Sequence, residues 1–182
     1  HQGDAVGLIC VSDRTVFEIP PRRNPAHLQL IFETLDQVEA KGVTGLIPVL
    51  HDLAEKVRRR ALVIVFSDFF ADPEALMGSF QHLRFQKHDL AVFHLLDRLE
   101  LDFQFDRPVR FVDMESSHSV VTEPASVRDE YLRQLHVYLE YLKAGCHEFN
   151  ADYRRVVTDR NYGDVLADFL VERSRAAALA SA

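Results

Sequence analysis

Acidic and hydroxyl side chains directly follow three apolar runs of this chain. The sequence places Ser67 and Asp68 after residues 61–66, Asp97 after residues 90–96, and Asp159 at the end of the run over residues 153–158. Apolar runs of this kind predict buried parallel strands, which bind ligands at their carboxyl ends. Carboxylate oxygens are the ligands that Mg²⁺ prefers. The pattern therefore predicts a candidate Mg²⁺ site at one rim of a sheet.

Each of these acids also has a structural interpretation, because Asp and Ser commonly cap the helix that follows a strand. Asp72 already holds the capping position before Pro73, which leaves Asp68 without an obvious cap to form. Asp159 could cap the last helix, a role that Asn161 could share. Asp68 is therefore the strongest functional candidate of the three acids.

Other catalytic patterns are missing from the sequence. It contains no Walker loop, no G-x-G-x-x-G, G-x-S-x-G or H-E-x-x-H motif, and no paired C-x-x-C. His94 falls inside an apolar run and is interpreted as a hydrogen-bonded core residue. Cys146 lies on the apolar stripe of a helix, so we expect it to be a core residue too. Sequence alone thus gives no pair of a nucleophile and a base.

Composition limits the class of protein. The 182 residues, 47% hydrophobic and 27% charged, are typical of one globular domain. With 21 basic against 28 acidic side chains the net charge is −7, which disfavours nucleic acid and anionic membranes as partners. The basic triplet 58–60 is interpreted as a solvated helix end. Two cysteines indicate a reducing, cytoplasmic compartment, and no apolar run approaches the roughly 20 residues that span a bilayer.

Hydrophobic periodicity predicts an alternation of strands and helices. In the first third of the chain we expect a strand pair over 4–12 and 15–19 that ends at Pro20 and Pro21, a helix from Pro25 that stops at Lys41 and Gly42, and a helix from about 46 to 57. Strands over 61–66 and 90–96 should follow, with a helix from Pro73 between them, and then a hairpin over 108–112 and 119–122 with its turn at 115–118. The chain should close with a helix over 125–149, a strand over 153–158 and a final helix. This order predicts an α/β fold with a doubly wound, mostly parallel sheet and helices on both faces.

Particular faces are predicted to be buried. A continuous apolar run such as 61–66 indicates a strand that is covered on both faces. Helical spacing assigns the remaining buried stripes: Leu28, Ile31, Leu35 and Val38 in the first helix, Leu46, Leu50, Leu53 and Val57 in the second, Leu76, Phe80 and Leu83 in the third, and Val165, Leu166, Phe169 and Leu170 in the last.

Several segments occur together in a familiar order. They are Gly3–Leu8, the loop around Thr44, Val63–Asp68, Leu99–Asp106 and Thr158–Asp159. In this order and spacing the chain resembles the C-terminal part of the bacterial domain of unknown function 58 family, whose core is similar to a von Willebrand factor A domain. The resemblance implies a single domain over residues 1–182 that is truncated at its N-terminus, with a hairpin insertion at about 99–124.

The resemblance also implies a metal-ion-dependent adhesion site for Mg²⁺. Such a site combines a D-x-S-x-S loop after the first strand, a Thr from a second loop and an Asp after the fourth strand. Thr44 matches the second part and Asp68 the third, whereas the first part would lie upstream of residue 1. Gly45 stands where relatives often carry an Asp. The site expected here is therefore incomplete.

The same resemblance implies a partner and an unusual sheet. Relatives usually occur with MoxR-type AAA+ ATPases and are thought to help assemble or activate other proteins, and the full-length protein could be membrane-associated. Without the first strand, the strands at 4–12 and 61–66 would leave two unpaired edges. We expect these strands either to pair directly or to form a homo-oligomer that covers the gap.

Three functions remain open at this point. The leading hypothesis is a non-enzymatic protein-interaction module that uses the rim around Thr44, Ser67 and Asp68. The alternative is a Mg²⁺-dependent phosphoryl-transfer or nuclease-like hydrolase that uses the acids Asp68, Asp97 and Asp159. The third is a structural remnant without a site.

Overall fold

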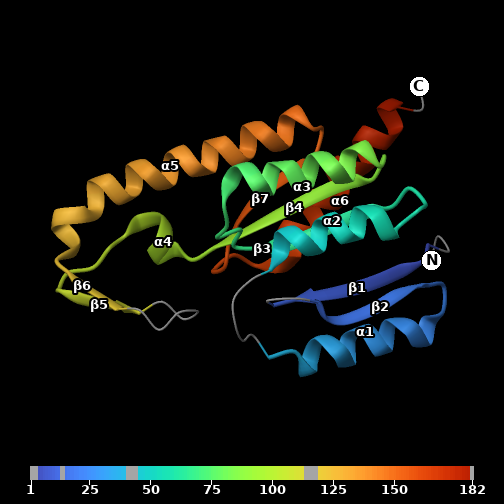
Figure 1. Ribbon diagram of the computed structural model, residues 1–182, viewed down its shortest axis with the longest axis horizontal. Helices are drawn as coiled ribbons and strands as arrows, with labels where there is room; N and C mark the ends of the chain where they lie inside the picture. The colour runs from blue at the N-terminus through green and yellow to red at the C-terminus, as the bar shows by residue number, and fades with distance from the viewer. Residues whose placement is uncertain (1–3, 13–14, 40–44, 113–118, 181–182) are drawn as a thin grey trace.

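A computed structural model describes residues 4–12, 15–39, 45–112 and 119–180, without the side chains of 176–180. Its elements, in chain order, are β1 (Val6–Val11), β2 (Thr15–Arg22), α1 (Pro25–Gln37), α2 (Leu46–Lys56), β3 (Leu62–Ser67), α3 (Pro73–Phe85), β4 (Asp89–Leu96), α4 (Arg98–Asp102), β5 (Val109–Val112), β6 (Ser119–Thr122), α5 (Pro124–Glu148), β7 (Asp152–Val157) and α6 (Tyr162–Ala180). Figure 1 shows their arrangement.

A parallel sheet of three strands, in the order β3-β4-β7, forms the centre of the molecule. The α/β class and the parallel sheet were predicted and are confirmed. β1 and β2 form a separate antiparallel pair, as do β5 and β6. In the described residues no ladder joins β1 to β3, so of the two alternatives expected for these strands direct pairing is not formed, while an oligomer that covers the gap stays a prediction. A doubly wound sheet running through all the strands is therefore not what the described part of the chain forms.

One face of the central sheet carries the main core, beneath α2, α3 and α5 (Figure 1). α3 begins at Pro73, and its N-cap Asp72 accepts a hydrogen bond from the Ala75 amide at 2.8 Å, as predicted. The predicted stripe of this helix is buried to 0–1% exposure at Leu76, Phe80 and Leu83. These apolar side chains pack α3 against the sheet and so fix the position of the loop that precedes it.

The opposite face of the sheet is covered by α6. Val165 and Phe169 pack against Ala91 and Phe93 of β4, and the rings of Phe93 and Phe169 lie 5.1 Å apart. The predicted stripe of α6 is wrong in part, because Leu166 is 41% and Leu170 61% exposed. Only the side of α6 that carries Val165 and Phe169 meets β4, so the neighbouring positions stay in solvent.

The described part of the chain covers β3 on one face only, which corrects the prediction for the apolar run at 61–66. Val63 and Val65 point into the main core, while Leu62, Ile64 and Phe66 are 39%, 42% and 58% exposed. A run of apolar residues shows that a strand prefers burial, but it does not show that a covering element is present.

β1, β2 and α1 form a hairpin with a helix beside it. The hairpin was predicted, but β2 continues through Pro20 and Pro21 to Arg22, because an edge strand tolerates proline. The predicted cap of α1 is confirmed, since the Asn24 side chain accepts from the Ala26 amide at 3.0 Å.

The predicted buried stripe of α1 is mostly wrong. Of its four members only Ile31 is buried, and Leu28 and Leu35 are 45% and 49% exposed. His27 is buried instead, with its Nε2 atom 2.9 Å from the Val6 carbonyl oxygen. α1 thus contacts β1 through a different face from the one predicted. The predicted end of this helix at Lys41 and Gly42 lies outside the described residues.

The predicted hairpin is confirmed as β5 and β6, although its turn at 115–118 falls outside the part of the chain that is described. The short helix α4 was not predicted. An aromatic cluster joins this region to α5, with ring centroids 4.4–5.6 Å apart among Phe103, Phe105, Phe111 and Tyr131. None of the described helices is long and apolar enough to cross a membrane.

Candidate functional site

The carboxyl ends of β3, β4 and β7 lie at one edge of the central sheet, as parallel strands require. Ser67 pairs with His94, whereas β4 continues to Leu96, which pairs with Val157. β4 and β7 therefore extend beyond β3 at this edge. The predicted site residues sit at two levels, with Asp97 and Asp159 beyond Asp68 along the strand direction.

Asp97 and Asp159 are brought together by residues that neighbour them in sequence. The Thr158 hydroxyl donates to Asp97 Oδ2 at 3.4 Å, and the Thr158 amide donates to the Leu96 carbonyl at 3.0 Å. Arg98 Nε donates to Asp159 Oδ2 at 2.5 Å. This hydrogen bond, and the charge of Arg98, lower the pKa of Asp159. The Asp159 carboxylate is thereby held ionised and paired with a cation.

Asp97 also has a structural role, whereas Asp159 does not form the helix cap that was considered for it. Asp97 is the N-cap of α4, where its Oδ1 accepts from the Leu99 amide at 2.8 Å and Glu100 completes a capping box. At the start of α6 it is Asn161, not Asp159, whose side chain accepts a hydrogen bond, from the Gly163 amide at 2.7 Å. Among the described residues, no three His, Cys, Asp or Glu side chains gather as ligands for a metal ion.

Asp68 belongs to a tight loop between β3 and α3. The Ser67 hydroxyl accepts from the Phe69 amide at 2.9 Å, and Asp68 Oδ1 accepts from the Phe70 amide at 3.2 Å. Phe69 has a φ of 52°, a left-handed conformation that is uncommon for a residue other than glycine. Two side-chain acceptors and a strained residue thus fix the direction in which this loop leaves the strand.

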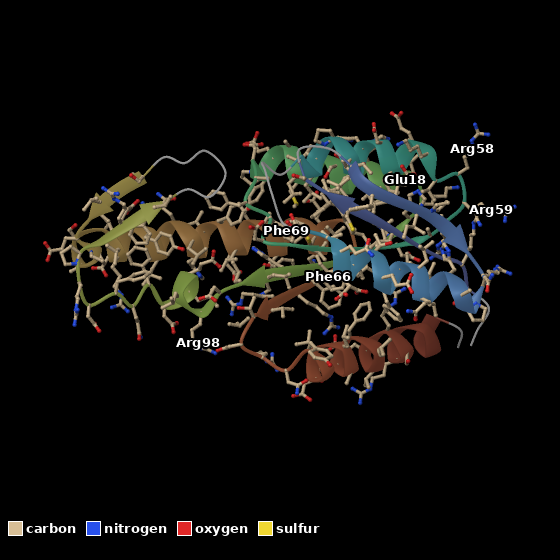
Figure 2. The ribbon with its side chains drawn as sticks, turned by 90° about the horizontal axis from the view of Figure 1, so that it is seen from below. Glu18, Arg58, Arg59, Phe66, Phe69 and Arg98 are labelled. Atoms are coloured by element: carbon tan, nitrogen blue, oxygen red, sulfur yellow. The ribbon has the colours of Figure 1, made fainter. Side chains whose placement is uncertain are left out.

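Phe69 and Phe70 face opposite environments. Phe69 is 1% exposed and packs edge-to-face on Phe80 at 6.0 Å and on His94 at 5.4 Å. Its carbonyl oxygen accepts a hydrogen bond from the Tyr138 hydroxyl. Phe70 is 96% exposed. Figure 2 shows Phe69 on the α5 side of β3 and Phe66 on the α6 side.

Sequence reasoning missed Phe70. The available signal was the pair of phenylalanines directly after Asp68, because adjacent residues that continue a strand point to opposite sides. The structure shows which of the two is outside.

His94 lies beneath this loop and is 1% exposed. Its Nδ1 atom lies 2.9 Å from the Tyr153 hydroxyl, which confirms the prediction of a hydrogen-bonded core histidine. Burial lowers the pKa of His94 and raises the pKa of Tyr153 to about 12. Burial likewise raises the pKa of the fully buried Cys146 to about 12, so this thiol is neutral and part of the core, as predicted.

The remaining predicted ligand, Thr44, lies outside the described residues. Its neighbour Gly45 donates its amide to the Ser12 carbonyl oxygen, which joins the end of β1 to the start of α2. The other four predicted site residues, Ser67, Asp68, Asp97 and Asp159, lie at one rim of the sheet because they are at the carboxyl ends of β3, β4 and β7.

Comparison with known proteins gives one family. The family model described as "Protein of unknown function DUF58" matches residues 1–138. Neither the curated proteins nor the solved structures give a match to this chain. Since the matched segment covers well over half of its length, the chain belongs to the DUF58 family.

Proposed function

We propose that this chain is a non-enzymatic protein-interaction module that binds its partner with one rim of the central sheet. We call this region the rim surface, and it consists of Ser67, Asp68, Phe70, Asp97 and Asp159. The observation that carries the proposal is the exposure of Phe70, at 96% of its side-chain and main-chain surface, on a loop that is tied down on both sides.

An exposed aromatic side chain on a pre-organised loop is well suited to anchor a partner protein. Phe69 is locked into the core next to Phe70, so little main-chain freedom is lost when Phe70 is covered. Complete burial of a Phe side chain contributes roughly 1.5–3 kcal/mol. Such anchors dominate the energetics of many protein interfaces.

Charges on the rim surface indicate the kind of partner surface. Asp68 and Asp97 are exposed carboxylates on the same rim, while Asp159 is already paired with Arg98. An apolar pocket bordered by Lys or Arg side chains would complement this arrangement. The engagement of Asp97 and Asp159 by Thr158 and Arg98 favours this module over a hydrolase with a three-acid site.

The identity of the partner comes from the resemblance described above. We take the partner to be a MoxR-type AAA+ ATPase, with which the module would act in the assembly or activation of other proteins. The free cysteines Cys10 and Cys146 support a reducing, cytoplasmic setting for this work.

A von Willebrand factor A-like fold with an incomplete adhesion site is also part of the proposal. Helices on both faces of a parallel sheet support it, as does the exposed carboxylate of Asp68 directly after β3. Thr44 and Asp68 would be the ligands from this chain. A bound Mg²⁺ would supply a Lewis acid that a carboxylate of the partner could coordinate.

The test is the affinity of this chain for a MoxR-type ATPase from the same source, measured by calorimetric titration. Phe70→Ala should weaken binding at least about tenfold, which corresponds to roughly 1.4 kcal/mol. Phe85→Ala is the matched control, because Phe85 is 81% exposed at the far end of α3. Equal effects of the two substitutions, or no effect of Phe70→Ala, would contradict the proposal.

A further inference from the structure

Two histidines face each other across the contact between α2 and α3. The Nδ1 atom of His51, on α2, lies 2.9 Å from the Nδ1 atom of His82, on α3. The two ring centroids are 5.2 Å apart, and the ring planes are tilted by 41°. Both side chains are half-buried, so solvent reaches the pair. Two nitrogen atoms that can act as metal ligands are thus brought together from neighbouring helices.

The main core fixes the main chain on both sides of this pair. His51 follows Leu50, which is 3% exposed, and His82 precedes Leu83, which is fully buried. Both leucines belong to the main core, and α2 and α3 lie side by side in Figure 1. Packing of the helices therefore brings the two imidazoles together whether or not anything is bound between them.

The spacing of the two rings matches the spacing that a tetrahedral metal ion requires. Two Zn–N bonds of about 2.0–2.1 Å at the tetrahedral angle separate the nitrogens by about 3.3 Å and the ring centres by about 5.2 Å. The ring centroids of His51 and His82 already have that separation. If the rings turn so that both lone pairs point at one ion, the Nδ1 atoms need to move apart by less than about 0.5 Å.

The surface beside His82 has room for an ion and its water ligands. Side chains of a helix lean toward its N-terminus, so the His82 ring leans over the turn that contains Gly78. Beyond the backbone of α3 and the chain neighbours of Gly78, a Cβ atom added at this glycine would meet nothing within 4 Å. Asp52, next to His51, and Glu55, one helical turn further on, are exposed carboxylates that favour a cation here.

From this geometry we infer that His51 and His82 bind one divalent transition-metal ion, such as Zn²⁺, through their Nδ1 atoms. Neutral imidazole is a preferred ligand of these ions, whereas Mg²⁺ prefers oxygen. Both rings would then carry their proton on Nε2. Within the described residues no third His, Cys, Asp or Glu joins the pair, so water molecules complete the coordination.

This metal site is separate from the rim surface. His82 is in the last turn of α3, whereas the loop with Phe70 precedes the first turn. The ion would link α2 to α3 in place of the hydrogen bond between the two rings. The inference therefore does not depend on the proposed function.

Calorimetric titration of the chain with ZnCl₂ tests the inference. The unmodified chain should bind Zn²⁺ at a site that Mg²⁺ does not occupy. His51→Gln and His82→Gln should each weaken this binding at least about tenfold. The matched control is His136→Gln, which should have no effect, because His136 is an exposed histidine on α5. Zn²⁺ should also raise the urea midpoint of the unmodified chain and of the control, but not of the two variants, since a ligand of the folded state stabilises it.

A measurement on the unmodified chain keeps the test independent of the folding of any variant. In NMR spectra, Zn²⁺ should shift the ring resonances of His51 and His82 together, and at a lower concentration than those of His136. The inference is overturned if the unmodified chain does not bind Zn²⁺, if His136→Gln weakens binding as much as His51→Gln does, or if the ring resonances of the pair do not move.

Discussion

The Tyr138 hydroxyl donates a hydrogen bond to the main-chain carbonyl oxygen of Phe69, across 69 positions of the sequence. This contact joins the middle of α5 to the loop after β3. Because the next residue is Phe70, the side chain that we propose as the anchor of the interface is oriented by a helix far away in the chain.

Tyr138→Phe should therefore loosen the loop without altering the rim surface itself. Removing the hydroxyl takes away one of the two hydrogen bonds that the Phe69 carbonyl oxygen accepts, since the Ala71 amide still donates to it at 2.7 Å, and we expect a cost of about 0.5–1.5 kcal/mol. We expect faster amide hydrogen exchange over residues 69–72 and weaker binding of the ATPase.

The control is Tyr141→Phe on the same helix, since Tyr141 is 43% exposed. A Tyr138→Phe variant that loses stability but keeps its exchange rates over residues 69–72 would show that Tyr138 only packs and does not position the loop.

Asp68 can be tested with two substitutions that both remove its charge but differ in the loop hydrogen bond that they keep. Asp68→Asn keeps an oxygen acceptor for the Phe70 amide, whereas Asp68→Ala removes it. Because Asp68 is exposed, both variants should change the free energy of unfolding by less than about 1 kcal/mol. Both should weaken ATPase binding, and both should abolish any heat of Mg²⁺ binding seen by calorimetry with the unmodified chain.

Two outcomes would count against this assignment. Unfolding of the Asp68→Asn variant would make Asp68 a structural residue. If the unmodified chain gives no heat with Mg²⁺, also in a version extended upstream of residue 1, the adhesion-site part of the proposal fails while the interaction surface stands.

His94 makes stability depend on pH in a defined direction. Burial lowers its folded-state pKa below the ordinary value, so the unfolded chain binds a proton more readily. Stability from this residue is present above about pH 6.5, the ordinary pKa of His, and is lost as the pH falls toward the folded pKa. The loss has a limit of about 1.4 kcal/mol per pH unit.

Urea unfolding between pH 7.5 and pH 5 would measure this slope. His94→Asn should be less stable at pH 7.5 and should show a shallower fall in stability on acidification. A variant slope equal to that of the unmodified chain would mean that His94 is not the group that titrates.

Burial, and not hydrophobicity alone, should decide the cost of truncating a leucine. Leu50 of α2 is 3% exposed in the main core, whereas Leu35 of α1 is 49% exposed. Leu50→Ala should cost roughly 2–5 kcal/mol of unfolding free energy, and Leu35→Ala less than about 0.5 kcal/mol. Comparable losses of unfolding free energy from the two variants would contradict the exposure of Leu35 and show that this side chain is buried in solution.

The sequence predicted correctly those helices and strands whose apolar face is covered by another element of the fold. α3 is the clearest example, because its Asp72 cap, Pro73 and buried stripe all agree. β4 was also predicted correctly, since it has a strand on each side and helices on both faces.

The errors have one physical origin. The apolar patterns of α1, β3 and part of α6 indicate surfaces that favour burial, yet Leu28, Ile64 and Leu170 remain exposed. A pattern reports the preference of a surface, while burial also needs a second surface in the right place. Sequence could not reveal whether that second surface exists.

The candidate site was predicted in outline. The common rim of Ser67, Asp68, Asp97 and Asp159 follows from parallel strands and needed no structure. The pairing of Asp159 with Arg98 could not be predicted, because it depends on the short helix α4, which has only 5 residues and too little periodicity to be detected.

The most direct test of the central claim is a comparison of amide hydrogen exchange in the chain alone and in its complex with the MoxR-type ATPase. The account predicts that protection on binding concentrates at residues 67–72 and 97–99. Protection confined to α1, to β3 or to the β5–β6 hairpin, with the rim unchanged, would contradict it.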